Sequence, residues 1–108
     1  MLKQIFEKNA IDNDDLKQMI KWIKDEPIFF DEEKRLLSKS EILNYKEELT
    51  INIECIPLID LFDNNYVIYN IEDKEFQIFD ISDNSIVKRG ISIDNYIELI
   101  REVINNVQ

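Results

Sequence analysis

Apolar residues recur at helical spacing near both ends of the chain and alternate with polar residues in its middle. The first helical pattern lies on Leu2, Ile5 and Phe6. A second follows the spacing i, i+3, i+4, i+7, on Leu16, Met19, Ile20 and Ile23. Each pattern predicts an amphipathic helix. For the second helix we expect an N-cap at Asp12 or Asn13 and an end at Pro27.

The segment LLSKSEI, residues 36–42, predicts the start of a third helix. Ser38 and Glu41 have the spacing of a capping box, in which each side chain accepts a hydrogen bond from a backbone N–H left unpaired at the helix start. We expect this helix to run from Lys39 to Glu48 and to pack through a narrow apolar stripe. The short apolar run at residues 28–30 is predicted to be a strand or a buried linker.

Strands are predicted in the middle of the chain, where side chains alternate with a period of two. The alternation begins at Ile51 and is expected to stop at Pro57, because proline has no N–H to donate within a sheet. The following LFDNN, residues 61–65, has the composition of a turn.

The stretch YVIYNIEDKEFQIFDI, residues 66–81, predicts a hairpin of two strands. A turn at Asp73 and Lys74 would place Ile71 opposite Phe76. Glu72 would then face Glu75 and repel it, so a slightly longer loop is also consistent with the sequence. In either register one face of the hairpin is more apolar, and we expect a helix to cover it.

The last part of the chain predicts one more strand and a long closing helix. Residues 86–89 form the strand, Gly90 takes a backbone conformation that other residues resist, and Ser92 is expected to cap the helix. The apolar positions from Ile93 to Val107 keep to one helical face. The predicted fold class is therefore α+β: a single domain, residues 1–108, with an antiparallel sheet of about four to six strands flanked by N-terminal helices and a C-terminal helix.

The chain is strongly acidic, with a net charge of -10 over 108 residues. Residues 51–108 contain eleven acidic and four basic side chains, whereas residues 1–50 contain twelve and nine. This balance argues against direct binding to nucleic-acid phosphates. It is explained either by solubility alone or by attraction to a basic partner. No apolar run is long enough to span a bilayer and no signal peptide is evident, so we expect a cytoplasmic protein without a membrane association.

Several enzyme classes are disfavoured by the residues the sequence lacks. There is no histidine to act as a general base or as a metal ligand. The single cysteine, Cys55, is predicted to be a buried apolar side chain rather than a reactive thiol. One glycine in the whole chain leaves no glycine-rich phosphate loop. We therefore expect no enzyme activity and no cofactor.

The segment DISDNSIVKRGI, which begins at Asp80, has the length of a calcium-binding loop. Ser85 stands where such a loop requires a glycine, and Ile91 stands where it requires a bidentate glutamate. We predict no metal site. Trp22 is expected to anchor the second helix to the core or its edge rather than to stack on nucleic-acid bases.

From Leu36 onward the order of motifs resembles the SUKH superfamily, which contains bacterial immunity proteins and fungal cell-wall-synthesis regulators. Ser38 with Glu41 matches the family's helix entry, and Pro57 with Asp60 matches its proline-containing strand. The aromatic hairpin and the closing helix SIDNYIELI complete the resemblance, over about two thirds of the chain. The sequence departs from the family where residues 21–34 lack a glycine and where Ile93 replaces a usual phenylalanine.

The resemblance implies an intracellular bacterial immunity protein that binds and neutralises a cognate toxin, often a nuclease, and it brings no catalytic residues. We expect a monomer or weak dimer that presents an acidic surface to a basic toxin. The candidate partner-binding residues are Asp60, Asp63, Glu72, Asp73, Glu75, Asp80 and Asp83. Two alternatives stay open: a nucleic-acid mimic that inhibits a DNA-binding enzyme, and a regulatory scaffold.

Overall fold

Within residues 12–106, six strands lie in the sheet in the same order as in the sequence, each antiparallel to its neighbours. The structure is a computed structural model, and it describes residues 12–106. The strands are β1 (Ile28–Phe29), β2 (Arg35–Leu36), β3 (Cys55–Phe62), β4 (Asn65–Asn70), β5 (Glu75–Asp80) and β6 (Ser85–Lys88). The helices are α2 (Asp14–Trp22), α3 (Lys39–Leu43), α4 (Tyr45–Glu48) and α5 (Asp94–Asn106). The predicted α+β class is confirmed.

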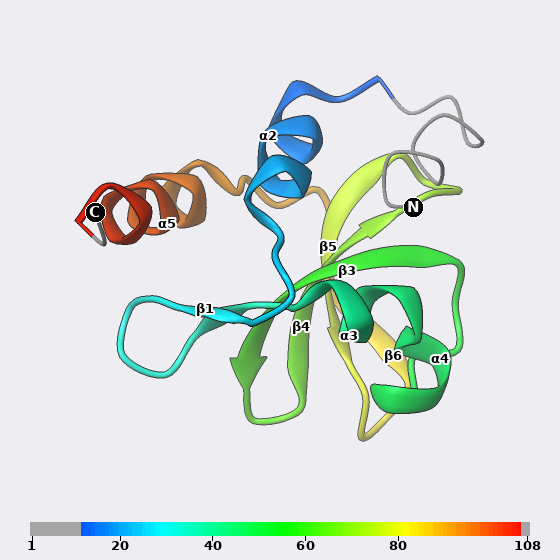
Figure 1. Cartoon of the computed structure of the whole chain (residues 1–108). Helices are drawn as coiled ribbons and strands as arrows, with labels where there is room; N and C mark the ends of the chain where they lie inside the picture. The colour runs from blue at the N-terminus through cyan, green and yellow to red at the C-terminus, as the bar shows by residue number, and fades with distance from the viewer. Residues whose placement is uncertain (1–11, 107–108) are drawn as a thin grey trace.

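The helices form two groups. In Figure 1, α2 and α5 lie next to each other, and α3 and α4 form a separate group beside β3. The buried side chains of helices α2, α3 and α5 belong to one hydrophobic core, which includes Leu16, Ile42, Ile97 and Ile100. The predicted pattern on Leu2, Ile5 and Phe6 lies outside the described residues, as does Val107 at the end of the closing helix.

Local signals for helix starts are confirmed at atomic detail. The Asn13 side chain accepts a hydrogen bond from the Leu16 N–H at 3.0 Å and caps α2. Both halves of the capping box between Ser38 and Glu41 are present at α3. The Ser92 hydroxyl accepts from the Asp94 N–H at 3.3 Å, immediately before α5. Trp22 is half-buried against the core, and the Arg101 guanidinium lies 5.7 Å from the centre of its ring, which links α2 to α5.

The predicted helix from Lys39 to Glu48 is wrong in its continuity, because it breaks at Asn44. The Asn44 backbone has φ -116° and ψ 31°, and its side-chain Nδ2 donates to the Ser40 carbonyl at 3.1 Å. The Ser40 carbonyl also accepts the Asn44 backbone N–H at 3.0 Å, so the side chain adds a second hydrogen bond at the end of α3. The result is two short helices, α3 and α4.

The strand expected from Ile51 to Pro57 is displaced toward the C-terminus. Residues 51–54 keep the predicted alternation in burial, with Ile51 fully buried, but the strand starts only at Cys55 and continues through Pro57 to Phe62. Proline is tolerated because β2 pairs with β3 only at Ile59 and Asp60, so among the described strands only β4 pairs with β3 at Pro57. A register shift follows directly after it.

The hairpin has the longer of the two expected loops. Asn70 pairs with Glu75 and Tyr69 with Phe76, which leaves the four residues 71–74 in the loop. The change of two positions keeps each side chain on its predicted face. Both faces are nevertheless buried, since Val67 and Ile68, which point to opposite sides, are each fully inaccessible to solvent.

Candidate partner-binding surface

The seven candidate carboxylates do not form one continuous surface. Six of them lie at the two ends of the strands. Asp63, Asp80 and Asp83 lie at the end that carries the β3–β4 and β5–β6 turns, which we call the paired-turn end. Glu72, Asp73 and Glu75 lie at the opposite end, in and next to the β4–β5 loop. Asp60 lies within β3, paired with Tyr66 of β4.

The two acidic ends are separated by the length of β4. Five residue steps from Asn65 to Asn70 correspond to roughly 17 Å at the usual strand rise. This is about twice the Debye length of ~8 Å at physiological ionic strength. The two ends therefore act on a partner as separate sources of negative potential.

Asp60 is held in a largely buried ion cluster and is not available as an open surface charge. Arg35 of β2 lies between two carboxylates, 2.7 Å from Glu41 and 3.1 Å from Asp60. Asp60 also accepts the Phe62 N–H at 2.7 Å, and Glu41 accepts both the N–H and the hydroxyl of Ser38. The cluster ties β2 and β3 to the start of α3.

The electrostatics of this cluster favour its charged form. The hydrogen bond to Glu41 raises the pKa of Arg35, against the opposing effect of burial. Burial alone would raise the pKa of Glu41, but the hydrogen bonds from Arg35 and Ser38 together outweigh burial and lower it. Both partners thus stay ionised at neutral pH, and we interpret the cluster as a structural tie.

The β4–β5 loop is organised by a fully buried glutamine, Gln77. Its Nε2 donates to the carboxylates of Asp73 at 2.8 Å and Glu75 at 3.0 Å, and its Oε1 accepts from Asn70 Nδ2 at 3.0 Å. Asn70 in turn accepts the backbone N–H groups of Glu72 and Asp73, each at 3.0 Å. Every hydrogen-bonding group of the Gln77 side chain is therefore engaged.

Two of the three carboxylates at this end also hold the segment after β6. Glu75 accepts the N–H of Gly90 at 2.8 Å, and Asp73 accepts the Arg89 guanidinium at 3.0 Å. Gly90 has φ +57°, a conformation that glycine adopts without strain. Asp73 and Glu75 thus serve internal contacts, and Glu72 is the member of the three whose carboxylate has no hydrogen bond or ion pair within residues 12–106.

The paired-turn end presents its carboxylates more openly. Asp80 accepts the N–H and hydroxyl of Ser82 at 2.8 and 2.6 Å, and these bonds lower the pKa of Asp80. The exposed carboxylates of Asp63 and Asp83 make no ion pair with any described lysine or arginine. The Ile81 N–H donates to the Asn64 carbonyl at 2.9 Å and joins the two turns.

The β3–β4 turn has a conformation that is demanding for a chain with so little glycine. Phe62, Asp63 and Asn64 have φ of 66°, 51° and 67°. Asp and Asn tolerate this left-handed region, as hairpin turns of this type require, whereas phenylalanine adopts it at some cost. The turn therefore holds Asp63 in a defined place at the tip.

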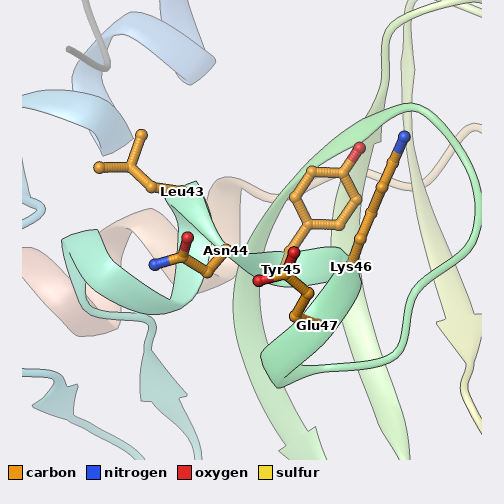
Figure 2. Close-up of a pocket in the computed structure, with 5 residues that line it drawn as sticks. All are labelled: Leu43, Asn44, Tyr45, Lys46 and Glu47. Atoms are coloured by element: carbon orange, nitrogen blue, oxygen red, sulfur yellow. The ribbon is translucent and has the colours of Figure 1, made fainter.

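A hollow of about 160 Å³ lies at the break between α3 and α4, lined by Leu43, Asn44, Tyr45, Lys46 and Glu47. Figure 2 shows Tyr45 and Lys46 alongside each other, with Leu43 projecting away from them. Ligand sites usually enclose about 300–1,000 Å³. No group of three or more potential metal ligands occurs within residues 12–106.

Cys55 is confirmed as a buried thiol. Burial raises the pKa of Cys55 to about 12, so the reactive thiolate is scarce at neutral pH. No helix in the described part of the chain is long and apolar enough to cross a membrane.

Arg35 and Gln77 organise the candidate surface, and neither residue was predicted from the sequence to do so. A polar residue inside the apolar run EFQIFDI was a usable signal for Gln77, because buried polar groups need partners. Nothing comparable marks Arg35, whose two acidic partners come from separate elements.

No protein-family model, curated protein or solved structure matches this chain.

Proposed function

We propose that this chain is a bacterial immunity protein that acts in the cytoplasm and neutralises a basic toxin by covering part of the toxin's surface. The observation that carries the proposal is the paired-turn end, where Asp63 and Asp83 stand exposed without a basic neighbour from the described residues. The net charge of -10 and the resemblance of the motifs to immunity proteins support the same function.

The physical basis is electrostatic attraction between complementary surfaces. An acidic patch accelerates the encounter with a basic partner and orients it, and salt weakens this effect by screening. Asp63 and Asp83 supply this field at one end of the sheet, and Glu72 supplies a smaller one at the other. Asp60, Asp73 and Glu75 contribute to the field, but their carboxylates are already bound within the domain.

The test begins with capture of the partner from the native cell and its identification by mass spectrometry, followed by co-expression with the suspected toxin. Association kinetics are then measured at low and high salt for the variant Asp63→Asn/Asp83→Asn. Asparagine keeps the size of the side chain and tolerates the positive φ of Asp63. The matched control is Glu47→Gln/Glu98→Gln, which removes the same charge from exposed positions on α4 and α5.

We expect the first variant to associate more slowly, to depend less on salt and to protect less well against the toxin, while the control behaves like the wild type. Equal effects of both variants would mean that only the net charge matters. Unchanged association in the first variant would remove the paired-turn end from the interface. A captured partner that is a DNA-binding enzyme blocked by this chain would favour the nucleic-acid mimic instead.

A further inference from the structure

β6 is the last strand of the sheet, and its outer edge has no strand partner in residues 12–106. Ser85, Val87 and Lys88 of this strand are exposed, and Val87, at 50%, is one of two exposed large apolar side chains within residues 12–106, the other being Phe29 of β1 at 57%. An open edge presents unpaired backbone N–H and C=O groups that can pair with another strand. The opposite edge, β1, is only two residues long and precedes an acidic loop, so it is poorly suited to such pairing.

The charges around β6 are arranged in a self-complementary way. The turn before the strand carries Asp83, the centre is Ile86 and Val87, and Lys88 and Arg89 follow at the other end. Two copies of such a strand in antiparallel orientation bring the acidic end of each next to the basic end of the other. This local polarity differs from the rest of residues 51–108, which contain only two other basic side chains.

We propose that two copies of this chain associate weakly through antiparallel pairing of their β6 edges. A two-fold axis perpendicular to the sheet relates the two strands, so the start of each strand lies beside the end of the other. β6 is not regular, because Ile86 pairs with Phe79 and Lys88 with Ile78, which leaves Val87 as an extra residue in a bulge. The pairing therefore fixes which ends meet, and it brings the turn with Asp83 beside the end of the second copy that carries Lys88 and Arg89.

The internal ion pair of Arg89 with Asp73 does not prevent the proposed contact. The Arg89 side chain is 63% exposed, and exposed ion pairs of this kind contribute little to stability.

The association is expected to be weak. Pairing of residues 83–89 covers much less surface than the roughly 1,600 Å² of a standard stable interface. The two chains also repel each other through their net charges of -10. We therefore expect dimers only toward millimolar chain concentration.

The decisive experiment uses two single variants, Asp83→Arg and Arg89→Asp. In the first, both ends of β6 are basic, and in the second both are acidic. Each variant should fail to pair with itself, with a dissociation constant at least about tenfold higher than that of the wild type, because like charges face each other at both ends. An equimolar mixture should pair again, since every basic end then meets an acidic one. The double variant Asp83→Arg/Arg89→Asp should also regain the dimer.

Sedimentation velocity from micromolar to millimolar concentration measures the association, and circular dichroism with thermal melting confirms that each variant is folded. Arg89→Lys is the control that keeps the charge and should keep the dimer. A wild-type chain that stays monomeric over the whole range would overturn the proposal. So would single variants that still self-associate, or a mixture that stays monomeric while the wild type dimerises. No toxin is present in these measurements, so their outcome does not depend on the proposed function.

Discussion

Gln77 holds the residues of the β4–β5 loop together, so substitution of this one side chain should destabilise the loop. The variant Gln77→Leu tests this role directly. The side chain is completely buried and joins Asn70, Asp73 and Glu75 through three hydrogen bonds. Leucine has a similar volume and fills the space without a cavity. The substitution therefore removes the hydrogen bonds with little change in packing.

The expected loss of stability follows from the groups left behind. A hydrogen bond to a charged group contributes about 1.5–3 kcal/mol, and a buried amide that loses its partner costs about 1–3 kcal/mol. Asp73 and Glu75 each keep one other donor, Arg89 and Gly90, which reduces the loss. We expect the free energy of unfolding to fall by about 2–4 kcal/mol, or the Tm to fall by roughly 8–16 °C.

Urea denaturation and calorimetry of the wild type, Gln77→Leu and the control Gln18→Leu measure this change. Gln18 is half-buried on α2 and has no side-chain hydrogen bond among the described residues, so the same substitution should have little effect there. A further variant, Gln77→Glu, should be less stable than Gln77→Leu at pH 7, because it adds a third carboxylate beside Asp73 and Glu75. The stability of Gln77→Glu should rise at lower pH, where the new carboxylate becomes protonated. If Gln77→Leu unfolds like the wild type, Asp73 and Glu75 are not held by Gln77 and the assignment of these carboxylates to internal contacts is wrong.

Three further predictions concern single residues. Thr50 has φ +58°, which is strained for a β-branched residue. In urea denaturation, Thr50→Gly should raise the free energy of unfolding by about 1 kcal/mol, whereas Thr50→Ala should not. Cys55, with its pKa raised to about 12, should react with a thiol reagent only at the rate of unfolding, and fast labelling of the native protein would contradict its burial. The lowered pKa of Glu41 contributes stability that is complete above the ordinary value of 4.5 and is lost as the pH falls through the lower pKa of the folded state. Glu41→Gln should therefore weaken the fall of Tm at acid pH, and an unchanged fall would exclude this role.

The parts of the fold that the sequence predicts best are those that depend on neighbouring residues. The caps at Asn13 and Ser38 and the turn glycine Gly90 each involve groups within three residues of each other or a single backbone angle. Their energetics are local, so the residue type and its spacing determine them. The hairpin faces were also predictable, because a shift of two positions in the loop leaves the alternation unchanged.

The errors arise where tertiary neighbours decide the outcome. Pro57 can lie inside β3 only because β2 is too short to pair with it there, and the length of β2 cannot be read from the residues around Pro57. α3 ends where the Asn44 backbone leaves the helical region, and helical periodicity does not register such a change at a single residue. The sequence could not say which of the candidate carboxylates would be bound by Arg35 or Gln77, because these partners come from separate elements.

The candidate carboxylates fall into two groups, those bound within the domain and those open to a partner. Of the seven candidate carboxylates, Asp60, Asp73, Glu75 and Asp80 accept hydrogen bonds that help hold strands, loops or turns in place. A partner that displaced those bonds would have to compensate for the structure they maintain, whereas Asp63, Asp83 and Glu72 can meet a basic side chain without such a loss. Because the open carboxylates lie at two ends about 17 Å apart, beyond the ~8 Å range of unscreened attraction, a compact basic patch can engage one end at a time. The paired-turn end has two of the three, so a partner guided by charge should approach the sheet there.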